Sequence, residues 1–243
     1  MVYTYKTYVK GSQCDPEVKL SVIAIFELIE DSLTELLGSM SIDGVTAMKK
    51  YGAMWVFSKN TVRILRRPDW LEKFEVRSFI SKHSPLRIFL DTEAVDENGG
   101  RLFASRVELC ALDLETGRIR RPDTLGFRPE MEDPQPLEGL DFFRFSKVQP
   151  VKLESVTVRT MNLDYCCHTN NVEYVRFILN TYPAQHFKEH SISSIEMHYL
   201  GQSFEGDTLD IEKLPSEGAE QYFITRSGKN IASCSIVWEP RQE

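Results

Sequence analysis

The spacing of hydrophobic positions changes twice along the first half of the chain, and each change predicts a new element. Residues 2–10 are rich in Val, Tyr and Thr, which is typical of a strand. Asp15 and Pro16 then supply an N-cap and a first helical residue. The helix that they predict has an apolar face made of Val18, Val22, Ile25, Phe26, Ile29, Leu33, Leu36 and Leu37. Four β-rich runs follow it, at residues 54–66, 73–82, 86–96 and 102–113.

The second half of the chain shows the same succession of patterns. Residues 151–161 alternate as a strand, and Asn170 is a predicted N-cap with Glu173 as its capping-box partner. Pro183 ends the helix that follows. Further strands are predicted at residues 192–200, 208–214, 219–226 and 230–238.

This succession predicts an α+β fold made of two tandem units, in each of which an antiparallel sheet wraps around a long helix. Residues 99–105 and 227–233 share a turn glycine, a cation and an Ala-Ser pair at a constant offset of 128, whereas the helix starts differ by about 153. Extra residues around 39–53 account for the difference, as in a duplicated unit with one longer loop. The predicted organisation is an N-terminal unit at 1–125, a proline-rich and glycine-rich linker at 126–149, and a C-terminal unit at 150–243.

Composition narrows the functional class. A formal net charge of −7 disfavours general binding of nucleic acid, and the longest apolar run is too short and too charged to span a membrane. The N-terminus lacks a signal-peptide core, and five cysteines are an odd number for a disulfide framework. We therefore expect reduced thiols in the cytoplasm.

Residues 163–180 (LDYCCHTNNVEYVRFILN) concentrate the candidate chemistry. If residues 164–168 are extended, Asp164, Cys166 and His168 share one face, and Cys167 lies on the other. His168 would also precede a helix whose first amides can stabilise an oxyanion. An acid, a thiol and a base on one face are a reasonable arrangement for acyl transfer.

Plainer interpretations compete with catalysis at this segment. Cysteine is often a small buried hydrophobe, and Asn170 has a sufficient role as a helix cap. Adjacent cysteines form a poor chelate, and residues 163–180 contain no CxxC or HxxxH spacing, so no metal is expected at this segment. Spacing alone leaves catalysis and structural roles open.

The segment resembles the signature of plant and bacterial acyl-acyl-carrier-protein thioesterases, Asp-x-Asn-x-His-Val-Asn-Asn followed by a Tyr. Asp164, His168, Asn170, Asn171 and Tyr174 keep that register. Further resemblance is carried by Trp55-Val56 and by the sequence RRPDW at residues 66–70. The family fold is a tandem pair of hotdog units, of which the second carries the reactive groups and the first shapes the acyl pocket.

The resemblance implies a cofactor-free thioesterase that releases fatty acids from acyl carrier protein. It implies catalytic positions at Asp164, His168, Cys166 and Gln202, the last two standing where the family has Asn and Glu. Because Cys is a weak donor and Gln cannot take a proton, a binding protein without hydrolytic activity and an acyl-coenzyme A thioesterase stay as alternatives. The expected substrate-binding residues are Asn170, Asn171, Tyr199, Phe26, Ile29 and Trp55.

Acyl carrier protein is acidic, so a negatively charged thioesterase needs a local cationic patch to bind it. The densest cations, and hence the predicted docking residues, are Arg63, Arg66, Arg67, Arg118, Arg120 and Arg121. We expect a pseudo-dimeric monomer or a homodimer.

Overall fold

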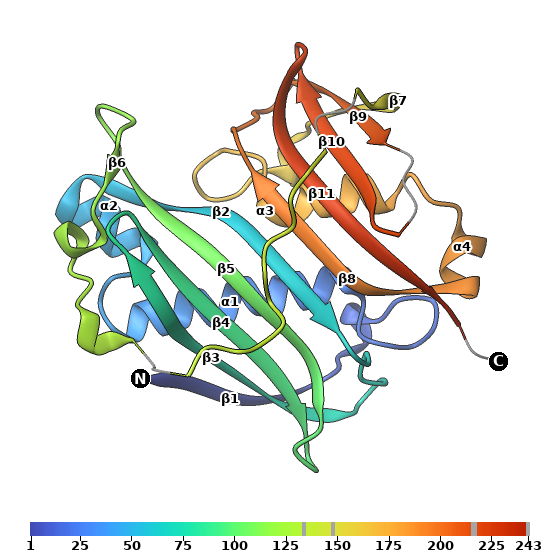
Figure 1. Cartoon of the computed structure of the whole chain (residues 1–243), viewed down its shortest axis with the longest axis horizontal. Coiled ribbons are helices and arrows are strands. Elements are labelled where there is room, and N and C mark those ends of the chain that lie inside the picture. Colours follow the sequence, from blue (N-terminus) through green and yellow to red (C-terminus); the bar gives the residue numbers. More distant parts are fainter. Residues whose placement is uncertain (133–134, 147–148, 215–217, 242–243) are drawn as a thin grey trace. The chain divides into compact units, whose positions relative to one another are not determined.

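The computed structural model describes residues 1–132, 135–146, 149–214 and 218–241, and the chain divides into two compact units (Figure 1). Unit 1 is Met1–Leu140 and unit 2 is Asp141–Glu243. No helix among the described residues is both long enough and apolar enough to cross a membrane.

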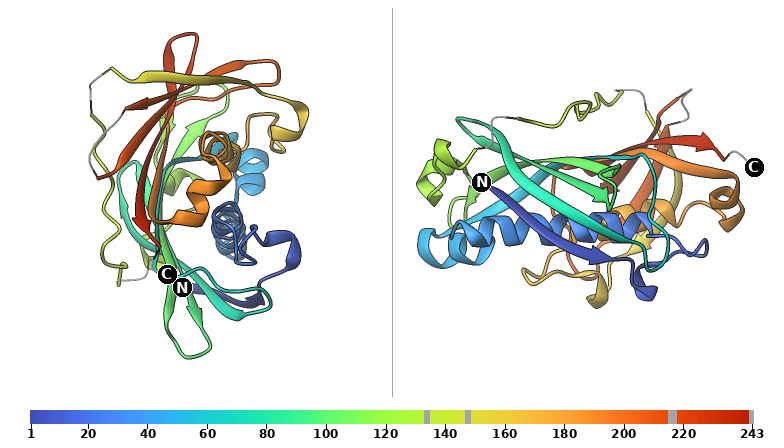
Figure 2. Two further views of the ribbon diagram at one scale, coloured as in Figure 1. Left: turned by 90° about the vertical axis from the view of Figure 1, so that its right-hand side faces the viewer. Right: turned by 90° about the horizontal axis from the view of Figure 1, so that it is seen from below.

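Unit 1 is a mainly antiparallel sheet with one long helix against its inner face (Figures 1 and 2). The strand order is β1-β3-β4-β5-β2, and the short β6 pairs with β5. Helix α1 contacts β1, β3 and β4, and its buried face includes Phe26, Ile29 and Leu33. The elements are β1 (Val2–Tyr8), α1 (Val22–Ser39), α2 (Gly44–Tyr51), β2 (Ala53–Ile64), β3 (Lys73–Ser84), β4 (Arg87–Asp96), β5 (Arg101–Asp113) and β6 (Ile119–Arg120).

Unit 2 repeats this arrangement with shorter elements. Its strand order is β7-β9-β10-β11-β8, so each strand takes the place of its counterpart in the β1–β5 sheet. Helix α3 buries an apolar face that includes Val172, Val175 and Ile178. The elements are β7 (Val151–Thr157), α3 (Asn171–Leu179), α4 (Ala184–Glu189), β8 (His190–Tyr199), β9 (Thr208–Leu214), β10 (Glu220–Arg226) and β11 (Lys229–Pro240). The predicted fold of two sheet-and-helix units is confirmed.

Two details of the predicted helices are wrong. The first long helix begins at Val22 with Ser21 as its N-cap, because Asp15 and Pro16 belong to a turn that precedes it. The two helix caps, Ser21 and Asn170, therefore stand 149 positions apart in the sequence instead of about 153. The extra residues of unit 1 include α2, which periodicity missed because it is short and largely polar; Asp43 caps its start.

The segment predicted as a linker is anchored to unit 1 by a buried ion pair. Arg106 on β5 binds Asp91 on β4 through two hydrogen bonds of 2.7 and 2.6 Å, and both side chains are almost completely buried. Arg106 also donates to the carbonyl oxygens of Leu137 and Leu140, and the Leu137 amide donates to Asp91. These bonds fix residues 137–140 on the sheet of unit 1.

Candidate functional site

Residues 164–168 form a tight turn, so the prediction that they are extended is wrong. One carboxylate oxygen of Asp164 accepts the amides of Cys166 and His168, at 2.8 and 3.1 Å. The Asp164 amide donates to the His168 carbonyl at 2.8 Å, and the Cys167 amide returns to the Asp164 carbonyl at 3.0 Å. Asp164 thus fixes the backbone on both sides of the two cysteines.

The turn removes strand alternation as the reason for placing the two cysteines on different faces, although their side chains do differ in exposure. Cys167 has a φ of 61° and an exposed side chain, whereas Cys166 is half-buried. Burial, followed by the charge of Asp164, raises the pKa of the Cys166 thiol. A raised pKa disfavours the thiolate, which favours the interpretation that Cys166 is not a nucleophile.

We expect iodoacetamide to alkylate Cys167 before Cys166. The exposed thiol is accessible, whereas the half-buried thiol is both shielded and harder to ionise. Timed alkylation followed by peptide mass spectrometry measures the order. Equal or faster labelling of Cys166 would show that the turn opens in solution.

Helix α3 begins directly after this turn. The Asn170 side chain accepts the Val172 amide at 2.8 Å, which confirms Asn170 as the N-cap. The Glu173 carboxylate does not complete a capping box, because it binds Asn162 and Arg176 instead. Asn171 is the first helical residue, and its carbonyl accepts the Tyr199 hydroxyl at 3.4 Å.

A second loop, residues 200–207 after β8, is fastened to the turn by a chain of buried hydroxyls. The Ser203 hydroxyl lies 2.7 Å from the hydroxyls of both Thr169 and Tyr174. The Thr169 amide donates to the Ser203 carbonyl at 2.9 Å. Gln202 is exposed and directly precedes Ser203, the residue that makes this connection.

His168 projects from the turn with its ring against Phe204. The ring centroids lie 5.1 Å apart at an interplanar angle of 71°. No hydrogen bond of either His168 ring nitrogen is found within the described part of the chain.

Unit 1 contains the same turn with different side chains. Asp15 accepts the amides of Glu17 and Lys19, and Val18 has a φ of 62°. In unit 2, Leu200 and Gly201 donate to one carbonyl, that of Ile231; in unit 1, Leu65 and Arg66 share the Leu102 carbonyl. Arg67 therefore occupies the position of Gln202.

Arg67 closes the turn of unit 1. Its guanidinium group pairs with both Asp15 and Glu17, and its side chain is 11% exposed. Gln202, the counterpart of Arg67, carries a shorter and uncharged side chain, which is exposed. The sequence pattern did not reveal this correspondence, since the two loops differ in nearly every residue.

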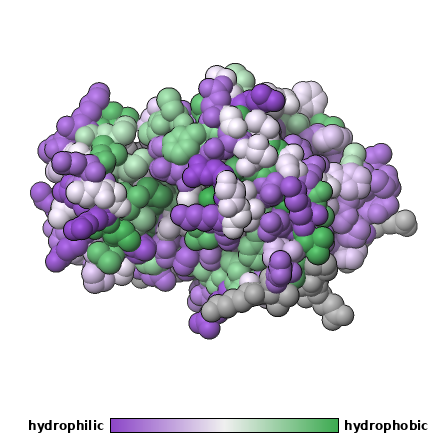
Figure 3. Space-filling view, turned by 90° about the horizontal axis from the view of Figure 1, so that it is seen from above, coloured by the Kyte–Doolittle hydropathy of each residue, from purple (hydrophilic) through white to green (hydrophobic). Residues whose placement is uncertain are grey.

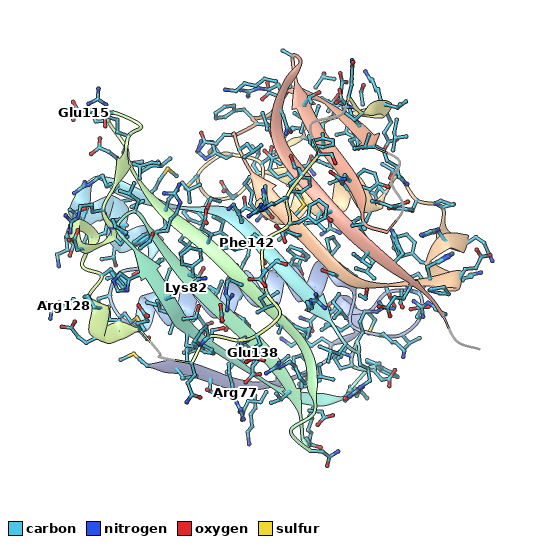
Figure 4. The ribbon with its side chains drawn as sticks, in the orientation of Figure 1. Arg77, Lys82, Glu115, Arg128, Glu138 and Phe142 are labelled. Atoms are coloured by element: carbon cyan, nitrogen blue, oxygen red, sulfur yellow. The ribbon has the colours of Figure 1, made fainter. Side chains whose placement is uncertain are left out.

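The predicted arginine patch is not one patch. Arg66 and Arg67 follow β2, near the start of β5, whereas Arg118, Arg120 and Arg121 follow the end of β5, beyond the turn marked by Glu115 (Figure 4). Thirteen residues of strand separate the two ends, which is roughly 40 Å. Figure 3 colours one face of the molecule by hydropathy, and hydrophilic and hydrophobic residues are interspersed over it.

Several of these arginines are also engaged within unit 1. Arg66 forms two hydrogen bonds to Glu72, Arg120 binds the Tyr51 carbonyl, and Arg121 pairs with Asp123. Arg67 is paired with two carboxylates and is 11% exposed, so little of its charge is accessible to a partner. Arg63 and Arg118 are exposed.

The residues expected to line an acyl pocket lie in hydrophobic cores. Phe26 and Ile29 are completely buried beneath the sheet of unit 1. The Trp55 indole donates to the Ile42 carbonyl at 2.6 Å and packs against a small alanine-rich cluster. A surface groove of about 700 Å³ exists elsewhere in unit 1, and it includes none of the predicted site residues: it is lined by Lys6, Thr7, Tyr8, Lys73, Phe74, Glu75, Arg77, Val95, Asp96, Glu97, Asn98 and Gly99.

The sequence did not indicate two residues that contact this segment: Ser203 forms a hydrogen bond with Thr169, and the Phe204 ring packs against His168. Neither belongs to a local motif, and only the pairing of two distant loops brings them to Thr169 and His168. No group of three or more His, Cys, Asp or Glu able to hold a metal ion is found among the residues that the structure describes.

Comparison with known proteins identifies the class. Residues 1–123 match the acyl-ACP thioesterase N-terminal domain, and residues 146–240 match the C-terminal domain. The fold is that of the 12:0-ACP thioesterase from Umbellularia californica, with a TM-score of 0.87 at 20% identity over 99% of this chain and 98% of that one. An acyl-ACP thioesterase from Bacteroides thetaiotaomicron gives a TM-score of 0.84 at 19% identity, with 98% of each chain covered.

These matches define a thioester hydrolase of the double-hotdog type, and the chain belongs to the acyl-ACP thioesterase family. Among curated relatives, a chloroplastic dodecanoyl-[acyl-carrier-protein] hydrolase of Umbellularia californica is 23% identical over 99% of this chain and 68% of its own length. A chloroplastic palmitoyl-acyl carrier protein thioesterase of Cuphea hookeriana is 25% identical over 84% of this chain and 54% of its own. The chain thus spans between about half and two thirds of these relatives.

Proposed function

We propose that this chain hydrolyses the thioester between a fatty acyl group and the phosphopantetheine arm of acyl carrier protein. The observation that carries the proposal is the Asp164 turn, which holds the backbone of His168 just before α3 and leaves its ring nitrogens without a hydrogen bond among the described residues. Membership of the acyl-ACP thioesterase family supports the substrate class.

In the proposed reaction water is the nucleophile. A neutral His168 imidazole accepts a proton from water as the oxygen attacks the thioester carbon, and the proton then passes to the departing thiolate. The products are a fatty acid and the free thiol of the carrier. Asp164 orients the base by fixing the backbone of the turn.

The test is hydrolysis of a panel of acyl-carrier-protein and acyl-coenzyme A substrates by the purified protein. We expect release of free thiol from acyl carrier protein, with the rate depending on chain length. Faster hydrolysis of the coenzyme A esters would reassign the carrier. Hydrolysis of none of them would favour the second candidate, a protein that binds acyl thioesters without cleaving them.

A specific observation favours that second candidate: Gln202 cannot accept a proton, and Cys166 is a weak hydrogen-bond donor. We expect Gln202→Glu, which supplies a carboxylate beside the turn, to raise kcat by about tenfold or more. Cys166→Asn should keep or raise activity, since the thiol is not the nucleophile. Single-turnover assays measure both, and a loss of activity in Cys166→Asn would indicate that the thiol participates.

The binding partner in this proposal is acyl carrier protein, and no metal or organic cofactor takes part. Of the predicted docking residues, Arg63, Arg66, Arg118 and Arg121 are exposed, and Arg66 and Arg121 also pair with carboxylates. All five cysteines are free thiols, which supports a reducing compartment such as the cytoplasm. The tandem units favour a monomer, and the alternative is a homodimer.

A further inference from the structure

The orientation of the His168 ring depends on an aromatic neighbour. The His168 ring contacts the ring of Phe204. Neither nitrogen of the His168 ring forms a hydrogen bond within the described residues. A histidine that serves as a base is usually oriented by a hydrogen bond to its second nitrogen. Here that means of orientation is replaced by an edge-to-face contact, which prefers a limited range of ring angles.

The scaffold itself brings positions 168 and 204 together. In unit 1 the counterparts of these positions are Lys19 and Asp69, and their side chains form an ion pair at 3.6 Å. The backbone bonds around both pairs correspond: Leu20 donates to the Pro68 carbonyl in unit 1, as Thr169 does to Ser203 in unit 2. The contact between these two positions is therefore a property of the turn and its partner loop.

Phe204 is itself held in place. The carboxylate of Asp207 accepts the Phe204 amide at 2.8 Å and pairs with Arg226 at 2.7 Å. The Arg226 guanidinium carbon lies 5.8 Å from the centroid of the Phe204 ring, within the range of a cation–π contact. Although Phe204 is 43% exposed, its backbone amide and its ring both have partners.

We propose that Phe204 is a positioning residue that holds the His168 imidazole in its productive orientation. This inference rests on the proposed thioesterase function and adds a residue to that site. An exposed aromatic ring of this kind contributes little to the core, so its removal should affect catalysis more than folding. Misplacement of a base by a fraction of an ångström lowers the rate of the chemical step with little effect on ground-state binding.

The decisive variants are Phe204→Leu, which keeps an apolar side chain without a ring, and Phe204→Tyr, which keeps the ring. We expect Phe204→Leu to lower kcat on the order of tenfold with KM changed by less than about twofold, and Phe204→Tyr to restore most of the rate. In proton NMR, the His168 ring resonance should lose its ring-current displacement in Phe204→Leu and keep it in Phe204→Tyr.

Asp69→Ala is the matched control, because Asp69 is the counterpart of Phe204 in unit 1; its kcat should equal that of the parent. Each kcat is calculated per mole of folded protein, with the folded fraction measured by circular dichroism. A parent-like kcat for Phe204→Leu, or equal losses in the Leu and Tyr variants, overturns the inference. A parent that hydrolyses no thioester removes the proposed function and this inference together, which is a different result.

Discussion

Replacing His168 with alanine should lower kcat/KM for acyl-carrier-protein substrates by about 10²- to 10⁴-fold, the usual cost of losing a general base. The fold should be retained, because the side chain is half-buried and its ring contacts Phe204 without a hydrogen bond to either nitrogen within the described residues. Thioester hydrolysis assays and thermal unfolding measure the two effects separately.

Lys19→Ala is the matched control, since Lys19 occupies the position of His168 in the turn of unit 1. It should hydrolyse at the parent rate. If His168→Ala also does so, the candidate site is wrong, whatever the family of the chain.

Variants of Asp164 distinguish two roles of this residue: the negative charge of its carboxylate and the hydrogen bonds by which it closes the turn. Asp164→Asn keeps an oxygen that can accept the amides of Cys166 and His168, whereas Asp164→Ala removes it. We expect the alanine variant to lose most activity and the asparagine variant to lie between it and the parent. Equal activity in all three proteins would mean that the turn does not depend on Asp164.

Replacing Arg106 with alanine should lower the free energy of unfolding by about 3–5 kcal/mol. The change leaves the Asp91 carboxylate, which is 0% exposed, without its cation. It also removes the donors to the Leu137 and Leu140 carbonyls that hold this segment on the sheet. Denaturant unfolding, monitored by tryptophan fluorescence, measures the difference.

Arg101→Ala is the control for this prediction, because Arg101 pairs with Glu93 on the same two strands while its side chain is 41% exposed. Such exposed pairs contribute less than about 1 kcal/mol. A double variant, Arg106→Met with Asp91→Leu, should recover part of the lost stability, since it leaves no unpaired charge. Similar unfolding energies for Arg106→Ala and Arg101→Ala would show that water reaches Asp91.

The sequence by itself determined the duplication and the order of the long strands and of α1 and α3, whereas it did not predict α2 or α4. Alternating runs predicted the strands, because a half-buried strand must place apolar residues at every second position. Helical spacing likewise predicted α1 and α3, and Asn170 was identifiable as a cap because capping is a local interaction of side chain with backbone. The family signature could be identified from the spacing of its residues along the sequence alone.

The tertiary structure decided how the candidate site is built. Residues 164–168 resemble a strand in sequence, yet the Asp164 carboxylate accepts two amides and closes them into a turn. Arg67 and Phe204 contact residues about 50 and 36 positions away, and paired loops bring them together. Local pattern cannot specify such contacts, because the energy that fixes them comes from burial and hydrogen bonds formed only when the unit is folded.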